Sequence, residues 1–127
     1  MKVYIPTDTF FNYSQCKALY EKYKDLIGDI DDFCKILLTT QFFSFFSSSG
    51  NFVGCLYFYY SPDGKLMMNG FSNRGMHLEN IKAIQLASKW YKTDIYAKTP
   101  HKTAVFCLLR AGFKKIDDKL YIKRKGD

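Results

Sequence analysis

The sequence has no long hydrophobic run and few of the residues that build metal sites. No segment approaches the roughly 20 apolar residues of a membrane-spanning helix, so we expect no membrane association. The two histidines and four cysteines show no C-x-x-C spacing, so we expect no metal centre. The first residues lack the apolar run of a signal peptide. We therefore expect a cytoplasmic protein with free, mostly buried thiols at Cys16, Cys34, Cys55 and Cys107.

Hydrophobic residues make up 47% of the chain and aromatic residues 18%. A chain of 127 residues buries about two thirds of its unfolded surface, which predicts a single domain, residues 1–127, that folds without metal or disulfide. The net charge of +7 is compatible with nucleic acid. The basic residues are mostly lysine and are spread along the chain, however, and lysine lacks the bidentate geometry with which arginine binds bases. These observations disfavour a nucleic-acid partner.

The first half of the sequence predicts a strand, a helix pair and three further strands. Apolar residues recur at helical spacing from Cys16 to Ile27, in a helix that residues 7–9 would cap and Gly28 would stop. A second helix is expected to start between Asp29 and Asp32. Two turns rich in serine and glycine then separate three strands of a meander, which we place at residues 42–47, 52–60 and 66–71.

The second half predicts helix, strand, helix and strand, and each boundary has a local cause. Arg74-Gly75 ends the preceding strand, Pro100 cannot continue a sheet ladder, and Gly112 suits the left-handed residue that follows a helix. The predicted elements are a helix at 78–91, a strand at 94–99, a helix at 104–113 and a strand at 119–124.

This order resembles that of the GNAT-type N-acetyltransferases along about the whole chain. The resemblance implies an α/β, GNAT-like fold, a mixed twisted sheet of about six or seven strands with helices on both faces, in the order β-α-α-β-β-β-α-β-α-β. It also implies an acetyl-coenzyme A site at the Arg74-Gly75 turn, where the family has an Arg-x-x-Gly-x-Gly/Ala motif whose backbone amides approach the cofactor pyrophosphate. Here His77 and Glu79 replace the later glycines, and Glu79 brings a negative charge to that turn. The cofactor-binding residues that the resemblance implies are Phe71, Arg74, Gly75, Met76, His77, Leu78 and His101.

A second stretch resembles the family pattern Asn-x-x-Ala-x-x-Leu-Tyr-x-x-x-Gly-Phe. Ala104, Gly112 and Phe113 match it, whereas His101 replaces the asparagine that contacts the pantetheine arm. Leu108 replaces the tyrosine that protonates the leaving thiolate, and leucine cannot donate a proton. The residues that pack and end the helix are therefore retained, while the chemical ones have changed.

Acyl transfer also requires a base and an oxyanion donor. A backbone amide near residues 68–70 is a candidate donor, because it does not depend on the side chain. Candidate acid–base groups are His77, His101, Glu79 and Cys107. Each has a structural alternative, since such histidines and glutamates often cap helices or face solvent and a cysteine on an apolar helix face is often a small buried hydrophobe.

Three functions follow from these observations. The first is an acetyl-coenzyme A-dependent N-acyltransferase of an unidentified amine, with weakened or lost catalysis. The second is a catalytically silent protein that works by contact, such as a tailed-phage virion component or a phage protein acting on its bacterial host, because the resemblance extends to small phage proteins of this type. Its protein partner, or a second copy, would bind exposed aromatics of the strands at 42–46 and 52–60. A basic nucleic-acid binder is the third and is disfavoured.

Overall fold

One mixed sheet runs through residues 1–27 and 31–126, which are the residues that the computed structural model describes. Its strands lie in the order β1-β2-β3-β4-β5-β7-β6. Neighbouring strands are antiparallel except β4 and β5, which are parallel. The elements, in chain order, are β1 (Lys2–Tyr4), α1 (Tyr13–Tyr23), α2 (Phe33–Thr39), β2 (Gln41–Phe46), β3 (Phe52–Tyr60), β4 (Leu66–Ser72), α3 (His77–Ser88), β5 (Ile95–Lys98), α4 (Lys102–Arg110), β6 (Lys114–Asp117) and β7 (Leu120–Lys123).

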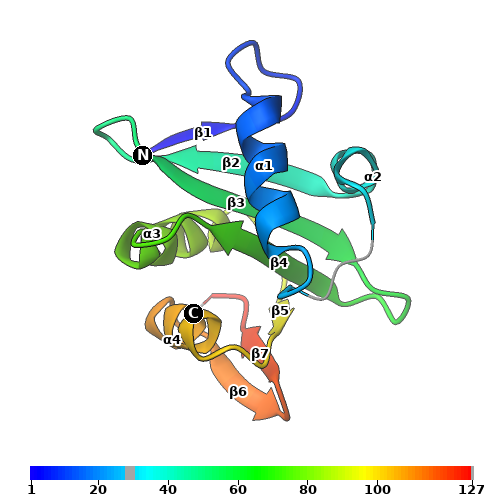
Figure 1. Cartoon of the computed structure of the whole chain (residues 1–127). Helices are drawn as coiled ribbons and strands as arrows, with labels where there is room; N and C mark the ends of the chain where they lie inside the picture. The colour runs from blue at the N-terminus through cyan, green and yellow to red at the C-terminus, as the bar shows by residue number, and fades with distance from the viewer. Residues whose placement is uncertain (28–30, 127) are drawn as a thin grey trace.

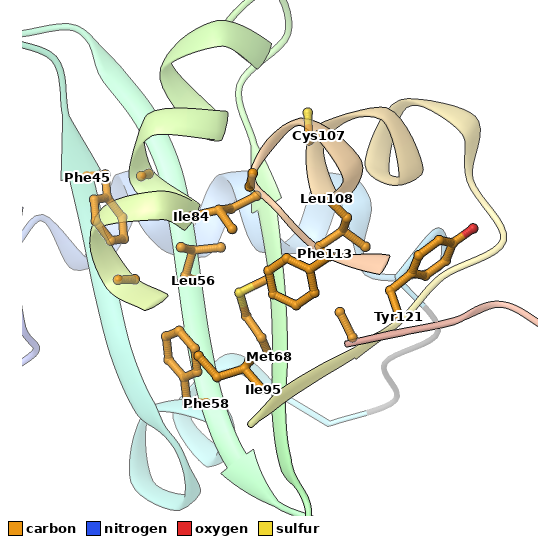
Figure 2. Close-up of a cluster of buried hydrophobic side chains, with 14 of the residues drawn as sticks. Phe45, Leu56, Phe58, Met68, Ile84, Ile95, Cys107, Leu108, Phe113 and Tyr121 are labelled. Atoms are coloured by element: carbon orange, nitrogen blue, oxygen red, sulfur yellow. The ribbon is translucent and has the colours of Figure 1, made fainter. Parts of the chain in front are cut away.

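Helices cover both faces of this sheet, as expected from the sequence (Figure 1). On one face α3 and α4 pack on a buried cluster that includes Phe45, Phe58 and Met68 (Figure 2). On the other face α1 and α2 pack on a second cluster, which includes Tyr20 and Phe42. The sheet is therefore buried from both sides, and the expected mixed α/β sheet with helices on both faces is confirmed.

The aromatic strands fill these two clusters rather than forming an exposed face. Tyr57 joins the cluster under α1 and α2, and its neighbour Phe58 joins the one under α3 and α4. Both side chains are 1% exposed. Of the aromatic residues in β3, only Tyr59 and Tyr60, at the end of the strand, reach solvent. The prediction that β2 and β3 expose a whole aromatic face is therefore wrong, because the helices occupy both faces. Contact with a partner through the exposed Tyr59 and Tyr60 stays a prediction.

The start of α1 differs from the sequence prediction. Asn12 caps the helix, since its side chain accepts a hydrogen bond from the Gln15 amide at 3.0 Å. Residues 7–9 do not cap it. Instead, the Asp8 carboxylate accepts a hydrogen bond from the Ile5 amide at 2.7 Å and closes a turn after β1.

The end of the first helix and the start of the second were predicted from local signals. The structure ends α1 at Tyr23, followed by turns. The predicted stop at Gly28 and the earliest predicted start at Asp29 lie outside the described residues. Asp32 caps α2 by accepting a hydrogen bond from the Lys35 amide at 2.8 Å, as carboxylates at a positive helix end favour.

The final predicted strand is the second half of a hairpin. Strand β6 precedes it and forms the edge of the sheet, with every residue exposed. The turn between the two strands places Lys119 at a φ of 59°. Strand β6 shows no apolar alternation in the sequence, because neither of its faces is buried. Elsewhere, no helix in the described part of the chain is long and apolar enough to cross a membrane.

Candidate functional site

A cavity of about 690 Å³ lies where β4 and β5 separate. The two strands pair only at Leu66 with Ile95 and at Met67 with Tyr96. Beyond these pairs β4 continues to Ser72, and α3 and α4 each begin after the end of one of the two strands. The cavity is lined by both strands, by the starts of both helices and by the segment that follows α1. The strand split therefore creates the space, and two helix N-termini border it.

The cavity brings together most of the residues that the resemblance implied for cofactor binding. Met76 and Leu78 are not among the described lining residues, since Met76 packs against the core and Leu78 is an exposed side chain. The two replaced positions of the second motif, His101 and Leu108, also line the cavity. The predicted residues that line the cavity are Phe71, Arg74, Gly75, His77, His101, Cys107 and Leu108.

The charged side chains among the described lining residues of this cavity are all basic. Arg74, Lys98 and Lys102 line it, and no carboxylate is found among its described lining residues. The sequence predicted that Glu79 would place a negative charge at this site, but Glu79 is not one of the residues that line the cavity. The arrangement favours an anionic ligand.

The start of α3 leaves backbone donors available at the cavity edge. The N-cap position, Met76, makes no side-chain hydrogen bond to the helix, and the first amides of a helix have no partner within it. Gly75 precedes it with a φ of +81°, and a Cβ at that position would meet nothing within 4 Å. The turn therefore favours a residue without a Cβ, and it leads directly into the first amides of α3, which are suited to bind an anion.

The two histidines at the cavity have different surroundings. His101 is half-buried at the N-cap position of α4, and its Nε2 atom donates a hydrogen bond to the Leu26 carbonyl oxygen. This bond places the proton on Nε2 and joins the segment after α1 to the start of α4. His77 is exposed, with its ring centroid 6.3 Å from that of Phe106. His101 therefore cannot use Nε2 as a base while this bond holds.

Cys107 and Leu108 belong to the buried cluster beneath α3 and α4 (Figure 2). The Cys107 thiol donates to the His77 carbonyl oxygen over 3.9 Å. Burial raises the pKa of Cys107, against a smaller lowering by a hydrogen bond with Asn80. The thiol is therefore protonated at neutral pH. Leu108 supplies only hydrocarbon to the cavity wall.

The expected oxyanion donor lies at the cavity wall but is engaged. The Asn73 amide donates to Val53 in β3, so by strand alternation the Gly70 amide points away from β3. It donates to the side-chain oxygen of the preceding Asn69 at 2.8 Å. A substrate oxygen would have to displace that side chain in order to accept the Gly70 hydrogen bond.

Alkylation distinguishes the thiols. Cys34 is exposed, so we expect iodoacetamide to modify it first at neutral pH. Cys107 should react much more slowly, because the thiolate is the reactive form and burial both raises the pKa of Cys107 and limits access. Peptide mass spectrometry over a time course measures both rates. Equal rates would show that the Cys107 side of the cavity is open and its thiol ionised.

Sequence reasoning did not identify Lys98 and Lys102 as site residues. In the sequence they look like any of the other surface lysines. Their positions at the end of β5 and the first turn of α4 become informative only when the fold places both segments at the split. Proximity to Pro100 was the one local signal that could have indicated them.

No protein-family model matches the chain, and neither does any curated protein, but solved structures do. An acetyltransferase of the GNAT family from Staphylococcus aureus Mu50 superposes with a TM-score of 0.58 at 16% identity, over 97% of this chain and 98% of the other. The ribosomal-protein-S5-alanine acetyltransferase of Vibrio fischeri gives 0.54 at 14% identity, over 71% and 64%. A variant of spermidine N-acetyltransferase from Vibrio cholerae gives 0.51 at 11% identity, over 87% and 73%. Together with the sheet order and the β4–β5 split, these matches show that the chain has a GNAT fold, far diverged in sequence from the solved examples.

Proposed function

We propose that this protein is an acetyl-coenzyme A-dependent N-acyltransferase of an amine. The observation that carries the proposal is the cavity at the β4–β5 split, which three basic side chains and no described carboxylate line. The resemblance to acetyltransferases at the same turn supports the identity of the ligand. The fold alone would not, since one fold supports many functions.

The residues present fit this cofactor at its anionic end. Arg74 and the open amides of the first turn of α3 would hold the pyrophosphate, and Lys98 and Lys102 would add to the positive field. When bound, the thioester supplies the acetyl group. The Gly70 amide would donate a hydrogen bond to the oxyanion once its bond to the Asn69 side chain is broken.

The fit is poorer at the reacting end. Leu108 cannot protonate a leaving thiolate, and its neighbour in α4, Cys107, is a thiol whose pKa burial raises, so that it stays protonated. We therefore propose slow catalysis. The same observation supports the second candidate, a GNAT-fold protein that acts by contact, for instance as part of a phage particle. Since the faces of β2 and β3 are covered, such a contact would use other surfaces.

Ligand binding separates the two candidates. If acetyl-coenzyme A binds the native state at a hundredfold excess over its dissociation constant, the free energy of unfolding should rise by about 2.7 kcal/mol. The melting temperature should then rise by roughly 5–20 °C. Arg74→Ala should reduce the shift, whereas Arg124→Ala, a change to an exposed arginine outside the cavity, should not. Differential scanning fluorimetry measures all three proteins.

Two results would contradict different parts of the proposal. An unchanged melting temperature at millimolar acetyl-coenzyme A would remove the acyltransferase and leave the contact function. A normal shift in Arg74→Ala would retain the cofactor but place its anionic end elsewhere in the cavity.

A further inference from the structure

A second cavity, of about 610 Å³, lies beside the first. It is bordered by α2, the end of β3, part of β4 and the end of β5. The two cavities share five described residues, so they meet at the strand split. These are Ile27, Met68, Asn69, Lys98 and Pro100.

The sheet side of this second cavity is an aromatic and thioether wall. Tyr57 pairs with Asn69 across β3 and β4, and Tyr59 pairs with Met67. Tyr57 belongs to the cluster under α1 and α2, so by strand alternation all four side chains face those helices. The two tyrosine rings stack with centroids 6.4 Å apart and an interplanar angle of 27°. Tyr57 is buried, whereas Tyr59 is 36% exposed, so the wall runs from the interior to the cavity mouth.

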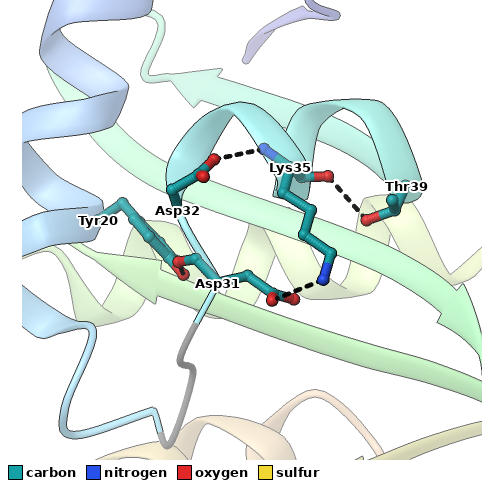
Figure 3. A network of polar contacts seen from close by, with 5 residues as sticks. All are labelled: Tyr20, Asp31, Asp32, Lys35 and Thr39. Carbon is teal, nitrogen blue, oxygen red and sulfur yellow. Dashed lines mark hydrogen bonds and ion pairs between the residues drawn. The ribbon is translucent and has the colours of Figure 1, made fainter.

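The opposite side is formed by α2 and by Asp31 before it, and Figure 3 shows the contacts that Thr39 and Asp31 make there. The Thr39 and Thr40 hydroxyls both donate to carbonyl oxygens of their own helix, at 2.7 Å. Asp31 is the one carboxylate among the described lining residues, and it forms an ion pair with Lys35 at 3.1 Å. Lys98 adds one positive charge to the lining. The described lining of the second cavity therefore carries no excess of negative charge.

We propose that this second cavity binds the acceptor, and that the acceptor is a monoamine with an aromatic or apolar body. The inference rests on the proposed function. The body of the amine packs on Tyr59 and Met67, since aromatic and thioether groups make favourable contacts with rings. Its amino end points to Asn69, where the cavities meet. A polyamine is disfavoured, because a chain with several ammonium groups needs several unpaired carboxylates and the described lining holds one, which is already paired.

Binding can be tested without acetyl transfer. Phenethylamine and spermidine are each titrated into the ¹⁵N-labelled protein, with and without coenzyme A, and the amide shifts are followed. We expect phenethylamine to shift amides of β3, β4 and α2 around the second cavity, and to bind at least tenfold more tightly than spermidine. Tyr59→Leu keeps an apolar side chain but removes the ring. It should weaken the binding of phenethylamine roughly 2- to 10-fold, as expected for the loss of one aromatic contact. Tyr96→Leu is the matched control, since Tyr96 lines neither cavity.

Three outcomes would overturn the inference. They are spermidine binding as tightly as phenethylamine, phenethylamine shifts outside the second cavity, or equal effects of Tyr59→Leu and Tyr96→Leu. Absence of any amine binding is a fourth outcome that would overturn it. In all these cases the coenzyme A titration reports separately on the proposed function: amine failure with coenzyme A bound refutes this acceptor class alone, and failure of coenzyme A refutes the acyltransferase.

Discussion

Replacing Leu108 by tyrosine is expected to raise the rate of thiol release from acetyl-coenzyme A by roughly 10²–10⁴-fold, the usual contribution of a positioned general acid. Leu108 lines the cavity at the position where the resembled family has its proton-donating tyrosine. The larger ring would extend from the wall of α4 into the 690 Å³ space. A thiol-detecting assay with a panel of small primary amines, phenethylamine included, measures the change.

Leu109→Tyr is the matched control for that gain. Leu109 is the next residue of α4, is 50% exposed and does not line the cavity, so a tyrosine there adds the same group outside the site and should leave the rate unchanged. If Leu108→Tyr binds acetyl-coenzyme A normally and is no faster than the parent, loss of the acid is not what limits catalysis. If the parent itself turns over rapidly, a substitute acid exists, and Cys107→Ser and His101→Ala should identify it.

The fold was predictable where a boundary depends on its own residues. Pro100 ends the segment after β5, and Gly112 follows α4 with a φ of 103°, as a residue without Cβ allows. Gly75 likewise adopts a left-handed conformation between β4 and α3. These boundaries survive in a diverged sequence because they restrict the backbone directly.

Features that depend on distant parts of the chain were missed. Strand β6 is defined only by its pairing with β7 and leaves no apolar pattern. Asn12 and the residues at 7–9 all carry side-chain oxygens that can cap a helix, and the packing of α1 decided among them. The aromatics of β2 and β3 were assigned an exposed face although helices were expected on both faces of the sheet, because the sequence does not show how far the helices extend along these two strands.

The candidate site was predicted in part. The Arg74-Gly75 turn and the motif ending at Gly112 indicated one cavity, and both segments do border it. Sequence spacing could not show that Glu79 is absent from the described lining. Nor could it show that Asn69 occupies the Gly70 amide, since such facts depend on where side chains point after folding.

Gly54→Ala is expected to lower the free energy of unfolding by roughly 3–5 kcal/mol, a large share of the 5–15 kcal/mol typical of a domain. Gly54 pairs with Ser72, and a Cβ at Gly54 would lie 2.3 Å from the Phe71 carbonyl oxygen and 2.6 Å from the Ser72 Cα. Both atoms belong to the backbone, so β3 and β4 would have to move apart rather than a side chain rotate.

Gly50→Ala provides the comparison, because Gly54 and Gly50 both have a positive φ, +152° and +88°, yet a Cβ at Gly50 would meet nothing within 4 Å. The Gly50→Ala variant therefore measures the conformational cost alone, about 1–2 kcal/mol, without the steric cost of a clash. Urea unfolding measures the free energy of unfolding of both variants. Phe71 and Ser72 line the cavity at the strand split, so any folded Gly54→Ala protein should also bind acetyl-coenzyme A more weakly, while Gly50→Ala should bind it normally. Equal stability of the two variants would show that β4 tolerates displacement, and that the close approach of β3 to β4 does not fix the position of the cavity wall.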